Sequence, residues 1–459
     1  MRAAVTPRLK RTFDALGVPN YRRYFVGQVV SLSGNWMQTV AELWLVLSLT
    51  GSALAVGVTT ALQFTPMLLV GAFGGVIADR HDKRRLLMLT QVLMALPALA
   101  LFGLTAGGLV EPWMIFALVF ARGAVNAFDN PARQSFLVEL VGSNKLINAV
   151  GLNSALVQTA RVFGPAGAGI AIATLSVQAC FLLNALSFGA MLWALERMRP
   201  AELERSEPAP RKRGQLRSAL RYVQSTPQLL IPLSMMALAG TLAYNFQVLL
   251  PLMARFSFHG GPGTYAALTS AMGAGAIVGA LAVGTRKRVP PAFLSGAALV
   301  FGGALAVAAL APTLDLELIA LALTGLASVT FAASVNSALQ LGAKPSMRGR
   351  VMSLYSVVFL GSTPIGGPLM SLIAGHAGPR TSMLVGAAAA LTAGLVARIA
   401  YRRTLGITGE GVALPSPGGI PGEEPVLAEA AEAETRRRRV WRPRGEHTGP
   451  RPRQASPLG

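Results

Sequence analysis

The sequence has little charge for its length and very few cysteine and histidine residues. Only 13% of its 459 residues are charged, about half the share in an ordinary soluble domain, so most of its surface is expected to face lipid. The single cysteine, Cys180, allows no internal disulfide, and four scattered histidines offer no metal site. There is no Gly-x-x-x-x-Gly-Lys-Ser/Thr loop, no nucleophile with an adjacent base and no pair of catalytic carboxylates. We therefore expect a protein that is not an enzyme, does not hydrolyse ATP and needs no cofactor.

Long apolar runs account for most of the chain. A transmembrane helix needs about 20 mainly apolar residues, and twelve segments meet this requirement. They are 24–49, 54–78, 86–107, 112–131, 147–173, 176–196, 229–254, 264–285, 290–311, 317–341, 350–375 and 380–401. The sequence thus predicts an all-α membrane protein with 12 transmembrane helices. Because the number of spans is even, both termini are expected on the same side of the membrane.

The positive charges indicate which side that is. All but four of the 41 Lys and Arg residues fall in the N-terminal segment, in alternate loops or in the C-terminal segment. Cytoplasmic loops are enriched in Lys and Arg, so both termini are expected in the cytoplasm, with the protein in the cytoplasmic (inner) membrane. The N-terminal segment is basic and lacks a long apolar run, so no cleavable signal peptide is expected. Topology accounts for the net charge of +21, and nucleic-acid binding is not expected.

Loop composition divides the chain into four parts. Residues 1–200 and 228–403 hold six predicted spans each, and residues 201–227 form a cytoplasmic linker rich in Pro, Glu and Arg. Residues 404–459 lack a core pattern, so a disordered basic cytoplasmic tail is expected there. This tail either contacts anionic lipid headgroups or is simply solvated. We expect the protein to be a monomer in the lipid bilayer.

A short charged segment, GGVIADRHDKRR from Gly74, separates the second and third predicted spans. Its Gly75-x-x-x-Asp79-Arg80 pattern, followed by Lys83 and Arg84, resembles the loop 2–3 signature of the major facilitator superfamily of transporters. The two halves of the chain also resemble each other weakly. The resemblance implies two six-helix bundles related by an axis along the membrane normal, with the substrate site between them near the bilayer midplane.

In this family the loop 2–3 signature implies a gating latch. Gly75 would allow a close helix approach, and Asp79 would contact the start of span 11. The basic residues would pair with an acidic residue at the end of span 4, where Asp129 stands. Asp82 departs from the signature, because the family has glycine at that position. The alternative is that the basic run only anchors the topology of the chain.

Two glycine–proline pairs are expected to shape the helices at which the two halves pack. They are Gly164-Pro165 in span 5 and Gly367-Pro368 in span 11. Glycine permits close packing and proline bends a helix. The first pair resembles part of an antiporter signature, and a plain interface of small residues is the alternative.

Three ionisable residues lie deep in the predicted spans of the first half, namely Glu42, Arg122 and Arg161. A charge at mid-membrane costs at least about 2.5–3.5 kcal/mol, so such residues usually serve a function. Glu42, with Gln38 and Asn35 one and two turns below it, is the candidate proton carrier. A static ion pair between Glu42 and Arg122 is the alternative. The second half contributes polar candidates to the pathway, which are Tyr244, Asn245 and Asn336.

Further motifs narrow the resemblance to a branch of bacterial efflux proteins that includes the enterobactin exporter. They are NYRRYF from Asn20, the DNPAR run from Asp129 and the RGRVM run from Arg348. The resemblance implies a transporter that exports a small organic molecule, such as a drug, siderophore or metabolite, by proton antiport with alternating access. The alternatives are an importer or facilitator of the same fold, and a membrane sensor or assembly protein that does not transport.

Overall fold

Helices make up nearly all of the computed structural model, which describes residues 13–204, 215–284 and 289–405. Within these ranges there are helices, turns and connecting segments but no strand. Several helices begin at a proline, whose missing N–H would have no partner in the first helical turn; these prolines are Pro19, Pro112, Pro227, Pro291 and Pro345. Two others have a side-chain cap. The Ser52 hydroxyl accepts from the backbone N–H of Ala55, and the Asp82 carboxylate accepts from that of Arg85.

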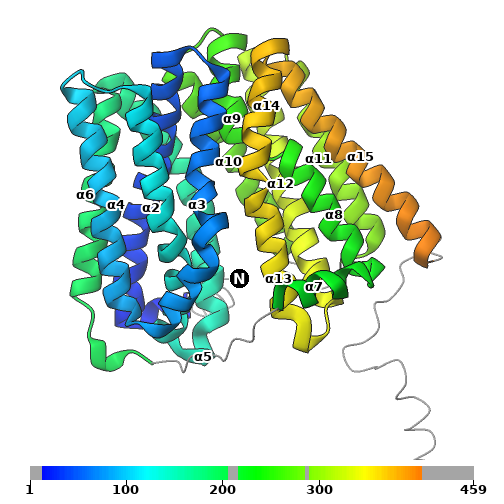
Figure 1. Ribbon diagram of the computed structural model, residues 1–459, viewed down its shortest axis with the longest axis horizontal. Coiled ribbons are helices and arrows are strands. Elements are labelled where there is room, and N and C mark those ends of the chain that lie inside the picture. The colour runs from blue at the N-terminus through cyan, green and yellow to red at the C-terminus, as the bar shows by residue number, and fades with distance from the viewer. Residues whose placement is uncertain (1–12, 205–214, 285–288, 406–459) are drawn as a thin grey trace, which may run out of the picture. The chain divides into compact units, whose positions relative to one another are not determined.

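The first half of the chain forms one helical bundle (Figure 1). Its helices are α2 (Pro19–Thr50), α3 (Ala53–Arg80), α4 (Lys83–Ala106), α5 (Pro112–Thr174) and α6 (Val177–Glu196), preceded by the short η1 (Asp14–Gly17). In this bundle α2 packs on α5 and α6, α3 packs on α5, and α4 packs on α6.

The second half repeats this pattern. Its helices are α8 (Pro227–Leu242), α9 (Phe246–Leu252), α10 (Pro262–Gly284), α11 (Pro291–Leu310), α12 (Leu314–Gly342), α13 (Pro345–Gly361), α14 (Thr363–Ala377) and α15 (Pro379–Leu405). Here α8 packs on α12 and α15, α10 packs on α12, and α11 packs on α15. Equivalent helices therefore make equivalent contacts in the two bundles, as expected for two six-helix repeats.

The number of spans agrees with the sequence. Nine helices within the described ranges are long and apolar enough to cross a membrane. The remaining three spans are α2 and the two arms of α5, which are more polar because they carry Glu42, Arg122 and Arg161. The protein is therefore an all-α membrane protein of 12 spans in two bundles.

The expected loop between spans 4 and 5 is largely helical. The first arm of α5 continues past residue 131, and the direction changes at Gly142, whose φ of 66° and ψ of 175° lie outside the helical region. Glycine is required there because φ is positive. A Cβ at this position would also meet the Glu204 carboxylate, whose Oε1 would lie 2.5 Å away.

Two spans that were expected to be continuous are interrupted. Span 7 ends its first helix at Leu242 and resumes at Phe246, and a π-helical turn follows, η3 (Met253–Ser257). Span 11 divides into α13 and α14 at Ser362. Hydropathy does not reveal such interruptions, because the residues at the breaks are still mostly apolar or small.

The two bundles meet along two helix pairs, α3 with α14 and the second arm of α5 with α10. Small residues allow these helices to approach closely. A Cβ at Gly57 of α3 would clash with the Ser371 side chain of α14, and a Cβ at Gly169 of α5 would lie 2.6 Å from the Cβ of Ala266 in α10. The Ser270 hydroxyl also donates across this second pair to the carbonyl oxygen of Val162, at 3.1 Å.

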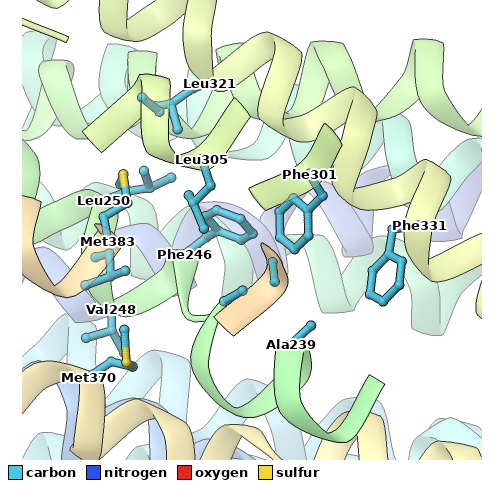
Figure 2. Packing of buried hydrophobic residues seen from close by; sticks show 14 of the residues in the cluster. Ala239, Phe246, Val248, Leu250, Phe301, Leu305, Leu321, Phe331, Met370 and Met383 are labelled. Atoms are coloured by element: carbon cyan, nitrogen blue, oxygen red, sulfur yellow. The ribbon is translucent and has the colours of Figure 1, made fainter. Parts of the chain in front are cut away.

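Aromatic and aliphatic side chains fill the second bundle. Figure 2 shows Phe246 beside Phe301 and Leu305, with Phe331 farther along the same cluster. The ring centroids of Phe246 and Phe301 are 6.3 Å apart, and those of Phe301 and Phe331 are 6.2 Å apart. The Phe301 ring packs against Phe246, the first residue of α9, and so stabilises the chain directly after the break between α8 and α9.

The segments between and after the bundles are only partly described. All described residues belong to one compact unit, Met1–Gly411. The expected basic tail lies outside the described residues from position 406 onward, and so do positions 205–214 of the expected linker. The linker ends in the helix α7 (Gln215–Gln224), of which Ala219 and Val223 are buried and Leu220 is exposed.

Candidate functional site

The first candidate site is an ion pair buried inside the first bundle. Glu42 of α2 lies 2.5 Å from Arg122 of α5, measured from Oε2 to the guanidinium. Their side chains are only 2% and 8% exposed. The amide of Gln38 donates a 2.7 Å hydrogen bond to the other carboxylate oxygen of Glu42. Both oxygens of this carboxylate are therefore satisfied, as a buried charge requires.

The ion pair continues into α6 through neutral side chains. Asn184 donates to the side-chain oxygen of Gln38, and the Ser187 hydroxyl donates to Asn184 at 2.9 Å. Gly34 of α2 leaves room for these groups, because a Cβ there would lie 2.5 Å from both Asn184 and Ser187. The network joins spans 1, 4 and 6. The sequence did not point to Asn184 and Ser187, because single polar residues in an apolar helix are common.

Arg122 is less completely satisfied than its partner. Its Nε is buried and has no hydrogen-bond partner within the described part of the chain. Losing Glu42 would leave a buried cation without compensation, which costs about 3–5 kcal/mol. The pair is thus a place where adding one proton to a carboxylate strongly changes the local electrostatics.

Asn35 lies one turn further down α2 and takes no part in this network. Its amide donates to the backbone oxygen of Ser31, at 3.0 Å, and its own backbone oxygen accepts from the Thr39 hydroxyl at 2.9 Å. These are local contacts of a polar residue with its own helix.

Arg161, the third expected ionisable residue, stands apart from the ion pair. Its guanidinium lies 5.1 Å from the centre of the Trp36 ring on α2. Among the described residues it has no salt bridge. Gly164, one turn further along α5, allows the two helices to touch here, since a Cβ at this position would clash with that of Trp36.

The second bundle faces this region with the interrupted span 7. Tyr244 lies in the break between α8 and α9, and α9 packs on α2 and α10. Its hydroxyl donates a 2.6 Å hydrogen bond to the backbone oxygen of Ser328. Asn245 donates to the backbone oxygen of Thr241 at 2.7 Å, and its own side-chain oxygen is buried without a partner among the described residues.

Asn336 of α12, the last polar candidate, accepts a 2.6 Å hydrogen bond from Gln340 on the same helix. It is half-buried, as are Asn35, Arg161 and Tyr244. The expected pathway residues therefore form two groups. One is the ion-pair network inside the first bundle, and the other is the region of Arg161 and Tyr244 where the bundles face each other.

The charged loop between α3 and α4 is held by different partners from those expected. Lys83 forms a buried salt bridge of 2.5 Å with Glu139, and Arg84 donates to the backbone oxygens of Leu195 and Glu196 at the end of α6, at 2.7 and 3.0 Å. Arg80 is exposed. Asp82, which stands where the family has glycine, caps α4.

Asp129 pairs elsewhere. Its carboxylate contacts Arg133 one turn along α5, and it accepts from Thr90 at 2.6 Å and Gln91 at 2.9 Å on α4. In this conformation the acidic partner of Lys83 is therefore Glu139, nearly three helical turns beyond Asp129 along α5. The surroundings of Gly75 and Asp79 are not described by the structure. The neighbouring Gly74 packs so closely that a Cβ would clash with the Ala127 carbonyl.

The glycine–proline pairs lie at helix contacts. Gly164 abuts α2, and a Cβ at Gly367 would lie 3.3 Å from the backbone oxygen of Gly57 in α3. Pro165 and Pro368 both lie inside their helices.

Glu317 in the first turn of α12 was missed by the sequence analysis. It is fully buried, and neither of its carboxylate oxygens has a hydrogen-bond partner among the described residues. Arg380 is the cation that interacts electrostatically with Glu317. It donates to the backbone oxygen of Ala309 and lies 5.4 Å from the Phe258 ring centre. Glu317 was the first residue of the predicted span 317–341. A charge at the end of a span is expected to lie at the membrane surface, so it was not chosen as a candidate.

A cavity of about 520 Å³ opens between α3 and α14. It lies where α3 begins and α14 ends, and its polar lining includes Ser52, Ser371 and His376. Because α3 begins at the turn after span 1, this cavity lies at the opposite end of the bundles from the charged loop between α3 and α4.

Comparison with known protein families identifies the family of this chain. The profile of the family described as transmembrane secretion effector matches residues 11–410. The chain belongs to this family of major facilitator transporters. It is therefore a multi-pass membrane transporter for a small molecule and not an enzyme.

Relatives of this chain include named efflux proteins. It is 25% identical to the macrolide efflux protein A of Streptococcus pyogenes, over 77% of this chain and 89% of that protein. It is 28% identical to the multidrug efflux pump Tap of Mycolicibacterium fortuitum, over 80% and 91%. A match of 29% identity to the staphyloferrin A transporter of Staphylococcus aureus covers 36% of this chain and only 42% of that protein.

Solved transporters share the fold at low identity. A bacterial homologue of the human lysosomal transporter Spinster, in an inward-facing and unoccupied conformation, aligns with a TM-score of 0.67 and 14% identity over 85% of this chain and 99% of that one. A bacterial homologue of the iron transporter ferroportin, in an inward-facing state, aligns with a TM-score of 0.65 and 16% identity over 83% and 98%.

Proposed function

We propose that this transporter exports a small amphipathic organic molecule across the cytoplasmic membrane, driven by inward movement of protons. The buried Glu42–Arg122 pair is the observation that carries the proposal. Export is supported by the names of the two relatives matched over most of their length. The cytoplasmic position of both termini and of the basic loops is part of the same proposal.

Glu42 is the proposed proton carrier. When it is ionised, its carboxylate holds Arg122 and Gln38 and ties spans 1 and 4 together. Protonation removes the charge that compensates Arg122, so the ion pair weakens and the two helices are free to shift. Protonation of Glu42 and binding of the substrate are thus proposed to favour different conformations of the first bundle, so that each event opposes the other.

Alternating access is proposed for the movement itself. The two close contacts between the bundles, α3 with α14 and α5 with α10, are equivalent to each other when the two halves of the chain are matched. Each bundle can therefore rock against the other about the region of Arg161. The contact between Gly57 and Ser371 lies toward the ends of these helices opposite the charged loop. This arrangement is consistent with a pathway closed on the outer side, and the two solved transporters above are in inward-facing states.

The loop between α3 and α4 is the proposed latch of this cycle. Lys83 already binds Glu139 near the end of the first arm of α5, and Arg84 binds the end of α6. Asp79 of the same loop is proposed to bind the start of α13 when the inner side closes. In that conformation the loop would connect the two bundles.

Transport by membrane vesicles tests direction and coupling together. A thermal-shift screen on the purified protein first supplies a substrate. Inverted vesicles should then accumulate it under a proton gradient, and a protonophore should abolish the accumulation. Accumulation that a protonophore leaves unchanged contradicts antiport. Accumulation by right-side-out vesicles but not by inverted ones would instead favour import, the activity of an importer with the same fold.

A further inference from the structure

Among the described charged residues inside the first bundle, one cation lacks an acidic partner. Three buried carboxylates are described there, and each pairs with its own base. The pairs are Glu42–Arg122, Asp129–Arg133 and Glu139–Lys83. Arg161 has no carboxylate of its own among the described residues, although it lies midway along the second arm of α5. A cation at this depth requires compensation, and the Trp36 ring supplies only part of it.

Arg161 lies where the two bundles touch. A Cβ at Gly273 of α10 would lie 3.1 Å from the backbone oxygen of Arg161, and Ser270 donates to the next backbone oxygen, that of Val162. Tyr244 lies on the other bundle just before α9, and α9 packs on α2 and α10, the two helices that lie against Arg161. A charge at this place faces the region that alternates in access during transport.

The second bundle offers aromatic surface beside this charge. The ring centroid of Tyr244 is 5.6 Å from that of Phe359, and Phe359 stacks on Tyr355 at 5.9 Å. The hydroxyl of Tyr244 is occupied by the backbone oxygen of Ser328. Tyr244 can therefore offer its ring rather than its hydroxyl to a ligand, and Phe359 is half-buried next to it.

We propose that Arg161, Trp36 and Tyr244 form a subsite that binds the anionic group of an aromatic substrate. The carboxylate or similar anion lies on the guanidinium of Arg161, in place of the missing acidic partner. The aromatic body lies against Tyr244 and Phe359. This inference rests on the proposed transport function and adds the chemical class of the substrate, an aromatic organic anion.

Gly164 is a positioning residue for this subsite. It brings α5 against α2 at Trp36 and so fixes the ring beneath the guanidinium. A larger residue at this position would move the ring without removing any group that touches the substrate.

Three probes with one ring system test the charge preference. They are 2-naphthoate, the neutral 2-naphthamide and the cation of 2-naphthylmethylamine, each titrated calorimetrically into the purified full-length protein. The anion should bind about tenfold more tightly than the amide, because its bond to the guanidinium is charge-assisted. The cation should bind most weakly of the three.

Arg161→Gln should remove the difference between anion and amide, and Arg161→Lys should keep part of it. Arg197→Gln is the matched control, because Arg197 lies 5.4 Å from the Trp193 ring centre at the end of α6, outside the subsite. This control should leave the anion preference intact. If Arg161→Gln does not fold, as shown by its thermal unfolding, Arg161→Lys carries the test through the size of its anion preference.

Equal affinity for the three probes, or no binding of 2-naphthoate by the folded protein, would overturn the subsite. An anion preference that survives in folded Arg161→Gln, or that is undiminished in Arg161→Lys, would overturn it as well. Calorimetry reports binding without transport, so the two proposals can fail separately. An Arg161-dependent anion preference without export in vesicles contradicts the transport proposal alone. Export with an anion preference independent of Arg161 contradicts the subsite alone.

Discussion

Removing the charge of Glu42 alone should destabilise the protein more than removing both charges of its ion pair. The two side chains are 2% and 8% exposed, so solvent provides little compensation for a lone Arg122. Breaking one partner of such a pair costs about 3–5 kcal/mol, whereas replacing both partners by neutral residues is often close to neutral. In Glu42→Gln the new amide can still contact Gln38, so the loss reports mainly on the charge.

Thermal unfolding of four proteins measures this coupling. They are the wild type, Glu42→Gln, Arg122→Met and the double variant, all purified in the same detergent. Both single variants should unfold at clearly lower temperature, and the double variant should recover most of the loss. Glu111→Gln is the control, because Glu111 is an exposed acid before α5, and its substitution should change the free energy of unfolding by no more than about 0.5 kcal/mol.

Transport by the same four proteins separates the two roles of Glu42. A proton carrier cannot be replaced by a neutral pair, so the double variant should be stable but should not couple transport to protons. If the double variant regains proton-driven transport, Glu42 is a static half of an ion pair. If all three variants unfold at the same temperature as the wild type, the ion pair contributes nothing to stability. The reasoning behind the proton carrier is then wrong.

Three further predictions concern the packing and the other buried charges. Gly164→Ala should lower stability by about 1–3 kcal/mol, because its Cβ clashes with α2, whereas Gly167→Ala enters open space and should be nearly neutral in the same thermal unfolding assay. Lys83→Met should cost about 3–5 kcal/mol by leaving Glu139 buried and unpaired, and adding Glu139→Gln should restore most of it; no recovery in thermal unfolding would mean that the two side chains do not interact. Glu317→Gln should raise the unfolding temperature, by an amount equivalent to about 1–3 kcal/mol, because the carboxylate is buried without a hydrogen bond; a lower unfolding temperature would show that the charge itself is stabilising.

The sequence predicted the features that follow directly from transfer of residues into lipid. Twelve apolar runs and the rarity of charges within them lead to the membrane fold, because each buried polar group in lipid is costly. The same reasoning singled out Glu42 and Arg122, which the structure places 2.5 Å apart. A charge at this depth needs a partner, and few candidates exist.

Features that depend on packing were not predictable in this way. The partner of Lys83 is Glu139 and not Asp129, because the first arm of α5 stays helical as far as Gly142 and carries Glu139 to the loop. The break of span 7 at Tyr244 is stabilised by tertiary contacts and leaves the hydropathy unchanged. Glu317 was not predicted to be buried, because the sequence near the end of a span does not show how deep each residue lies in the membrane.

Proton movement coupled to substrate is the most direct test of the transport mechanism. Purified protein is reconstituted into liposomes that contain a pH-sensitive dye, and a gradient of an identified substrate is imposed without any pH gradient. Antiport through Glu42 predicts that protons move opposite to the substrate, and that Glu42→Gln abolishes this proton flux. Substrate that crosses the membrane with no change in the internal pH would contradict proton antiport.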